Sequence, residues 1–167
     1  MILANLPART RVFVDANIIA LHMTQKSDLA EACSAFLRRV RKDRIQAFTS
    51  VIVVAEVIHR VMISEAVGKL NLPPRKAVGH LKAHPNLVMD LSKHLAVPSK
   101  VYQMGISIEP VTRVDLHTSR LVRKNYGLMT NDSLIVAVMQ RLKLVHLVTN
   151  DDDFKRVNGI TIWKPLG

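Results

Sequence analysis

Short apolar, β-branched runs alternate with longer stretches of helical periodicity along this chain, and that alternation restricts the fold more than any other feature. Runs of strand length lie at 11–15, 45–49, 107–111, 144–149 and 160–163. The stretches between them carry apolar residues at i, i+3, i+4 and i+7, the spacing of one helix face. Strands that alternate with helices predict an α/β fold of three layers, α/β/α, with a mostly parallel central sheet.

Capping residues indicate where the helices begin and end. Side chains that accept hydrogen bonds from free backbone N–H groups favour N-caps, and glycine favours the position after a helix. Helices are therefore expected from about 17, from a cap at Ser27 or Asp28, from Ser50, over 114–124 with Gly127 behind it, and from Asn131. Prolines divide the stretch 70–100, which predicts two or three short extra helices to which we assign no chemistry.

The chain is expected to form a single domain, 1–167, because no repeat, low-complexity tract or linker divides it. Its hydrophobic fraction of 49% is sufficient for a core, to which the single cysteine, Cys33, should contribute. No apolar run approaches the roughly 18 residues of a membrane span, and residues 1–11 lack the order of a signal peptide. We therefore expect a soluble, cytoplasmic protein that does not contact membranes.

The net charge of +11, from 24 Lys and Arg against 13 Asp and Glu, attracts polyanions and makes nucleic acid the first candidate partner. The alternatives are that this charge serves solubility, or that it complements an acidic protein. Aromatic residues make up only 4% of the chain, which argues against a base-stacking platform. Contacts to a nucleic-acid backbone fit this composition better.

Four acidic residues are expected at one edge of the sheet. Parallel sheets form their ligand sites where the carboxyl ends of the strands open into loops. Asp15 ends the first strand, Asp151 follows the strand at 144–149, Asp132 opens a helix, and Glu56 lies about two turns into the helix after the second strand. Carboxylates this close repel one another, and a divalent cation would offset the repulsion. Mg²⁺ or Mn²⁺ held there could activate water for attack on a phosphodiester.

Each acid also has a simpler interpretation. Asp15 and Asp132 could be acids at helix starts, where they complement the helix dipole. Glu56 could pair with Arg60 at i+4 on the same helix. Residues 151–153 could form only a polar turn. The joint placement of all four acids favours the metal site.

The motifs at 12–19, 50–56, 128–137 and 147–154 resemble, in order, those of the PIN-domain ribonucleases, especially the VapC toxins of VapBC toxin–antitoxin systems. The resemblance implies a metal-dependent endoribonuclease and assigns its metal-binding acids to Asp15, Glu56, Asp132 and Asp151, with Asp153 as a further or substitute ligand. It also implies a homodimer and an antitoxin whose C-terminal segment occludes the acidic site. One departure is Ala16, because the family often has Ser or Thr there.

Supporting and competing roles complete the expectations. Asn17 should orient Asp15 or a metal-bound water, and Thr149 should support Asp151. Arg60 and Arg113 are expected near the site as contacts to the RNA backbone. The alternatives are a non-catalytic RNA-binding or assembly subunit with a PIN-like fold, and a phosphatase of the haloacid dehalogenase type. The phosphatase would need a second Asp two residues after Asp15, where this chain has Asn17.

Overall fold

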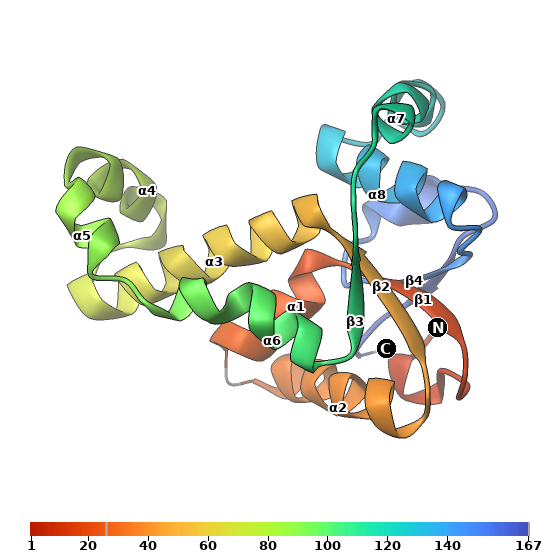
Figure 1. Cartoon of the computed structure of the whole chain (residues 1–167), viewed down its shortest axis with the longest axis horizontal. Helices are drawn as coiled ribbons and strands as arrows, with labels where there is room; N and C mark the ends of the chain where they lie inside the picture. Colours follow the sequence, from red (N-terminus) through yellow and green to blue (C-terminus); the bar gives the residue numbers. More distant parts are fainter. Residues whose placement is uncertain (26, 167) are drawn as a thin grey trace.

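The computed structural model describes residues 1–25 and 27–166 and is built around one parallel sheet (Figure 1). Its order is β3-β2-β1-β4-β5, and each neighbouring pair is parallel. The expected α/β fold of three layers is confirmed, and each strand end lies within one or two residues of its expected place. The strands are β1 (Arg11–Val14), β2 (Gln46–Ser50), β3 (Ile106–Glu109), β4 (His146–Val148) and β5 (Thr161–Trp163).

The first strand lies at the centre of the sheet because it is apolar on both faces. Val12, Phe13 and Val14 are fully buried, as expected for a strand covered by helices on both sides. Phe13 pairs with Phe48 of β2 and with Leu147 of β4. The carboxyl ends of β1 and β4 therefore lie next to each other.

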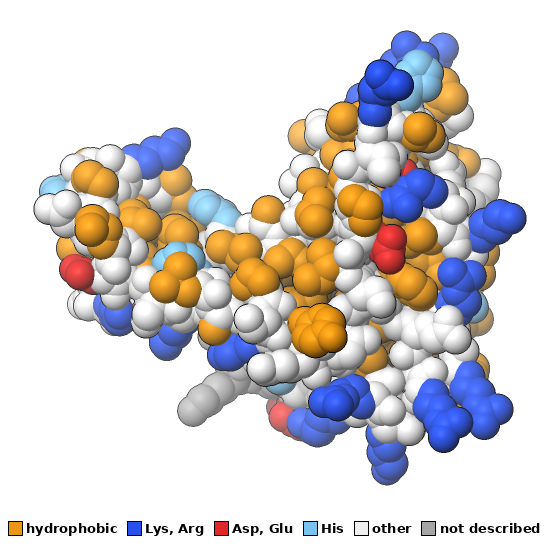
Figure 2. All heavy atoms as spheres, viewed as in Figure 1, with side chains coloured by type: hydrophobic (Ala, Val, Ile, Leu, Met, Phe, Trp, Pro, Cys, Tyr) orange, Lys and Arg blue, Asp and Glu red, His pale blue; other side chains and the backbone are white. Residues whose placement is uncertain are grey.

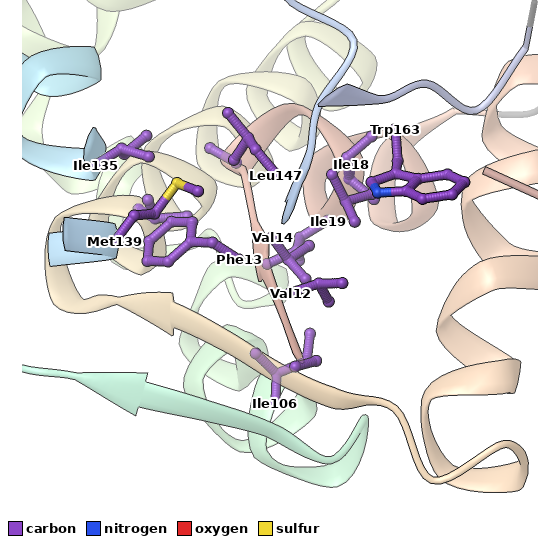
Figure 3. Close-up of a cluster of buried hydrophobic side chains, with 14 of the residues drawn as sticks. Val12, Phe13, Val14, Ile18, Ile19, Ile106, Ile135, Met139, Leu147 and Trp163 are labelled. Atoms are coloured by element: carbon purple, nitrogen blue, oxygen red, sulfur yellow. The ribbon is translucent and has the colours of Figure 1, made fainter. Parts of the chain in front are cut away.

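Helices cover both faces of the sheet (Figure 1). Figure 3 shows Phe13 beside Met139 of α8 on one face, whereas Ile18 and Ile19 of α1 lie towards Trp163. All five of these side chains belong to the main core cluster. The helices are α1 (Ala16–Thr24), α2 (Asp28–Lys42), α3 (Val51–Leu70), α4 (Pro74–Ala83), α5 (Pro85–Met89), α6 (Val97–Gln103), α7 (Arg113–Tyr126) and α8 (Thr130–Arg141).

The long helix α3 extends beyond the sheet and carries α4 and α5 at its far end (Figure 1). This end has its own small apolar cluster, in which Ala66 packs with Leu81 and Leu91. The segment 70–100 therefore forms a helical lobe, α4 and α5, followed by a 3-10 turn (Lys93–Ala96) and α6.

Most expected helix ends are found, with two differences. Ser27 caps α2 through its side chain, and Gly127 ends α7 in the left-handed region. Ser50 precedes α3 as expected, but its hydroxyl does not cap the helix. Asn131 is not the N-cap of α8, because that helix already begins at Thr130, after Met129. None of the helices in residues 1–25 and 27–166 combines the length and apolar character needed to cross a bilayer.

Candidate active site

The four expected acids lie at the carboxyl edge of the sheet, each at the start of an element or close to it. Asp15 follows β1 and is the N-cap of α1. Glu56 lies in the second turn of α3, after β2, and Asp132 lies in the first turn of α8. Asp151 follows β4, the neighbour of β1 in the sheet. The parallel arrangement thus directs residues far apart in sequence to one rim.

Asp15 is the most firmly held of the four. Its side chain is only 7% exposed. One carboxylate oxygen accepts a hydrogen bond from the backbone N–H of Ala16 at 2.6 Å. The other accepts from Asn17 Nδ2 at 2.6 Å and from Thr149 Oγ1 at 2.7 Å. Its orientation is therefore fixed by the start of α1 and by the segment after β4.

Thr149 and Asn17 connect the two strand ends. The Thr149 hydroxyl, fully buried, accepts from the backbone N–H of Asp151 at 3.0 Å while it donates to Asp15. Asn17 donates to that same hydroxyl at 3.0 Å, and its Oδ1 accepts from the N–H of Asn150 at 3.0 Å. One polar network therefore holds Asp15 and Asp151 in a fixed relation, with Thr149 supporting both.

Glu56 is paired with Arg60 one helical turn away. Arg60 Nη2 and Nε donate to the same Glu56 oxygen at 2.6 and 2.9 Å. The alternative pairing at i+4 is thus present. Glu56 is still close enough to raise the pKa of both Asp15 and Asp132. It also lines a cavity of about 390 Å³ together with Asp132 and residues 129–131.

The three consecutive acids after β4 have different surroundings. Asp152 pairs with Lys155 and Lys164, and Asp153 pairs with Arg156. Within residues 1–25 and 27–166, Asp151 has no ion-pair partner, although it accepts from the N–H of Asp153 at 2.8 Å. Arg156 was not foreseen as a partner of Asp153, and its place three residues later was the available signal.

Negative charge accumulates at the rim without full compensation. Burial raises the pKa of Asp15 from 3.8 to about 6, against the hydrogen bonds from Thr149 and Ala16, and the charges of Glu56 and Asp132 add to this rise. Burial also raises the pKa of Asp132, and the charges of Asp151, Glu56 and Asp153 contribute. These shifts mean that the carboxylates repel one another across the rim.

The donor set fits a divalent cation, although its members do not form a closed cage. Carboxylate oxygens are the ligands that Mg²⁺ and Mn²⁺ prefer, and a cation would offset the mutual repulsion that adds to the effect of burial on these pKa values. Among residues 1–25 and 27–166, no three Asp, Glu, His or Cys side chains converge as a ready metal-binding group. Glu56, one of the expected ligands, is paired with Arg60.

Arg113 does not lie beside the acids. It begins α7, and the first turn of α7 lies against the last turn of α8, where Arg141 Nε meets Asp115 Oδ1 at 3.0 Å. Asp132 lies nine residues before Arg141 on α8, so about 13 Å of helix separates the two places. Because α7 and α8 form an antiparallel hairpin, Arg113 begins α7 at the end of the hairpin opposite to Asp132, and its contact with the RNA backbone stays a prediction.

Comparisons with known proteins all point to the same family. The PIN domain model matches residues 12–160. Ribonuclease VapC2 of Methanocaldococcus jannaschii is 25% identical over 153 residues, which cover 91% of this chain and 92% of that protein. Among solved structures, the sarcin–ricin-loop-cleaving toxin VapC20 of Mycobacterium tuberculosis has a TM-score of 0.59 at 14% identity, covering 86% of this chain and 92% of that one. A chain of a toxin–antitoxin complex from Klebsiella pneumoniae has a TM-score of 0.54 at 19% identity, covering 92% and 97%.

The two solved structures share the fold at low identity, whereas the family model covers most of the sequence, including the strands that carry the acidic rim. The resemblance seen in the four motifs is therefore confirmed. The chain belongs to the PIN domain family.

Proposed function

We propose that the protein is a divalent-metal-dependent endoribonuclease and the toxin of a toxin–antitoxin pair. The observation that carries this proposal is the buried network in which Thr149 and Asn17 hold Asp15 and Asp151 at the ends of neighbouring strands. A ribonuclease among its relatives and toxin–antitoxin proteins among its structural neighbours support it. Membership of the PIN domain family argues against the phosphatase alternative.

Asp15, Asp132 and Asp151 would hold Mg²⁺ or Mn²⁺, with Glu56 as a fourth ligand and Asp153 as a further or substitute one. When bound, the cation would activate water and offset charge on the phosphodiester. Hydrogen bonds from Asn17 and Thr149 hold Asp15 in one orientation. Arg60 pairs with Glu56, and because its side chain is 50% exposed it could instead bind an RNA phosphate when the substrate is present.

The test is cleavage of a structured RNA by purified protein in Mg²⁺, Mn²⁺ or EDTA, beside Asp15→Asn and Asp132→Asn. Cleavage should require metal and be lost in both variants. Calorimetric titration with Mn²⁺ should show metal binding by the wild type and weaker binding by both variants. Asp28→Asn, at the exposed start of α2, serves as the matched control and should cleave normally. Failure of the wild type to bind metal would favour the non-catalytic RNA-binding alternative.

An antitoxin has room to bind beside the acids. A cavity of about 440 Å³ adjoins Asn17 and Arg60, and apolar side chains such as Leu21, Ile63 and Val67 form much of its wall. A C-terminal antitoxin segment lying there would occlude the acidic rim. Co-purification with a small DNA-binding protein encoded by an adjoining reading frame would test this, and Ile63→Glu should abolish it. Light scattering of the pure protein would test the proposed homodimer.

A further inference from the structure

Helix α7 carries basic side chains along the face that points away from the rest of the molecule. Their spacing of four, three and four residues places them within about 60° of one another around the helix axis. The residues that α7 buries, Asp115, Ser119 and Val122, lie on the opposite side. Figure 2 shows Lys, Arg and His side chains gathered over this projecting helix. We call the set the α7 stripe, which consists of Arg113, His117, Arg120 and Lys124.

The α7 stripe contains three cationic side chains, Arg113, Arg120 and Lys124, and no acid. All four side chains are exposed, and none has an ion-pair partner among the residues that the structure describes. The only acid of α7, Asp115, is 1% exposed and bound to Arg141. On α2, by contrast, Arg38 pairs with Glu31. A helix face that serves only solubility usually mixes both signs, so the α7 stripe calls for a polyanionic partner.

The stripe is fixed relative to the acidic rim. Arg123 Nη1 donates to Ser119 Oγ on α7 at 3.0 Å and to Ser133 Oγ on α8 at 3.1 Å, and Ser133 directly follows Asp132. The Lys124 end of the stripe therefore lies at the end of the hairpin that carries Asp132. From there the stripe runs for about 16 Å towards Arg113, at 1.5 Å per residue.

The chemistry of the stripe suits phosphate and not bases. Guanidinium and ammonium groups bind phosphate oxygens, with arginine able to form two parallel hydrogen bonds. The neighbouring exposed side chains are the aliphatic Val114, Leu116 and Leu121, so the face carries no Phe, Tyr or Trp for base stacking. We infer that the α7 stripe binds the phosphate backbone of the RNA substrate next to the scissile bond, without reading its bases. This inference rests on the proposed function.

The test compares two triple variants with the same loss of charge. The first, R113Q/R120Q/K124Q, neutralises the stripe. The second, K42Q/R44Q/K100Q, neutralises exposed cations at the end of α2 and on α6, elsewhere on the surface. Binding of a labelled RNA hairpin is measured by fluorescence anisotropy in EDTA over a range of KCl concentrations, so that metal-dependent cleavage does not interfere. Thermal melts check that each variant is folded.

Removing one side chain that binds a phosphate should reduce the slope of log K against log salt by roughly one. The stripe variant should therefore lose about two to three from this slope, and the control variant less than one, for hairpins of different sequence alike. R113K/R120K, which keeps both charges, should keep the wild-type salt slope. Equal effects of the two triple variants would overturn the inference. So would a stripe variant that binds RNA normally but changes its oligomeric state, since α7 would then be a protein interface.

The outcome is separable from that of the proposed function. Asp132→Asn should keep stripe-dependent RNA binding in EDTA while it loses cleavage in Mg²⁺. Normal RNA binding by the stripe variant, with cleavage still lost in Asp132→Asn, would overturn the inference about the stripe but keep the proposed nuclease. Stripe-dependent RNA binding by a wild-type protein that cleaves no RNA with any metal would overturn the proposed nuclease but keep the inference that α7 binds RNA.

Discussion

Asp15 accepts three hydrogen bonds and still ionises less readily than an ordinary aspartate. Burial outweighs the bonds from Thr149 and Ala16 and raises its pKa from 3.8 to about 6. The folded protein thus releases this proton at a higher pH than the unfolded chain does. Below about pH 4 the group is neutral in both states and costs nothing, whereas above about pH 6 its ionisation destabilises the folded state.

Asp15→Asn should therefore become progressively more favourable for stability as the pH rises from about 4 to 6. The pKa difference corresponds to at most about 3 kcal/mol of added unfolding free energy, apart from any pH-independent cost of the substitution. Urea unfolding in EDTA at pH 4 and pH 7.5 measures it. The substitution Asp152→Asn should instead become less favourable for stability as the pH rises, because the bonds from Lys164 and Lys155 lower the pKa of that exposed group. A gain for Asp15→Asn that does not depend on pH would contradict this explanation.

Thr149 offers a test of positioning at one atom. Thr149→Val keeps the shape of the side chain but removes the hydroxyl that donates to Asp15 and accepts from the N–H of Asp151. The free energy of unfolding should fall by about 1–3 kcal/mol, since buried polar groups lose their partner. RNA cleavage and Mn²⁺ affinity should fall by roughly 10- to 100-fold. Thr149→Ser should restore most of each, and a fully active Val variant would show that the hydroxyl does not position the acids.

The sequence placed Asp15, Asp132 and Asp151 at one rim because each follows or opens an element whose type was readable from its pattern. It could not decide between a free Glu56 and one paired with Arg60, because both fit the i+4 spacing and the side-chain rotamer makes the choice. The structure has the pair. The rotamer of a side chain within one helix depends on its three-dimensional surroundings, which a local sequence pattern does not contain.

At the scale of elements, the hairpin of α7 and α8 depends on Asp115. Its carboxylate accepts from the backbone N–H and the hydroxyl of Thr112, both at 2.8 Å, and from Arg141 Nε at 3.0 Å. It therefore caps α7 and ties it to the last turn of α8. Burial works against the charged form, but the bonds from Thr112 and Arg141 prevail and hold the pKa of Asp115 below its usual value.

Asp115→Ala should lower the free energy of unfolding by about 2–4 kcal/mol, since it removes a helix cap and leaves Arg141 without its buried partner. Asp28→Ala, in the exposed first turn of α2, should cost less than about 1 kcal/mol. Urea unfolding of both variants makes the comparison. Similar losses in the two variants would mean that the reciprocal hydrogen bonds between Thr112 and Asp115, a capping box, and the ion pair with Arg141 add nothing beyond a helix-dipole effect.

Helix positions were predictable from periodicity, but their ends were less so. Asn131 was expected to cap α8 because it is a favoured N-cap residue, yet the helix begins at Thr130, two residues earlier than a cap at Asn131 would place its start. The fully buried Ser133 donates to the carbonyl of Thr130 and accepts from Arg123 of α7. Ser133 thus ties the first turn of α8 to α7, and a shift of one or two residues is common at helix ends.

At the scale of the whole molecule, the order of the strands was not predictable. The alternation of strands and helices indicated a parallel sheet, but any order satisfies that pattern locally. In the order β3-β2-β1-β4-β5, the chain adds β2 and β3 on one side of β1 and then β4 and β5 on its other side. Ligand sites of open parallel sheets lie at such a change of side, between the carboxyl ends of the two strands. Asp15 after β1 and Thr149 after β4 meet there, which explains why their network joins them.

A buried carboxylate on α3 helps to fasten the lobe of α4 and α5 to this body. The side chain of Glu65, on α3, is 1% exposed and pairs with Lys69 Nζ at 2.8 Å. It also accepts from the backbone N–H groups of Ser92 at 3.2 Å and Lys93 at 2.8 Å. Burial opposes ionisation, but these bonds hold the pKa of Glu65 below its ordinary value of 4.5. The ionised carboxylate therefore fastens the chain that returns from the lobe.

Glu65→Gln should loosen the lobe without unfolding the sheet, because Ala66, Leu81 and Leu91 form a cluster separate from the main core. Hydrogen exchange of backbone amides in 74–96 should quicken by roughly tenfold or more, as expected when hydrogen bonds to a charged group worth about 1.5–3 kcal/mol are removed. Exchange in β1 and β4 should not change. Lowering the pH through the pKa of Glu65 should have the same effect, since the stabilising form is the ionised one. Lys69→Gln, which leaves the backbone donors in place, should quicken exchange less. Faster exchange in β1 and β4 as well would mean that lobe and sheet unfold as one unit.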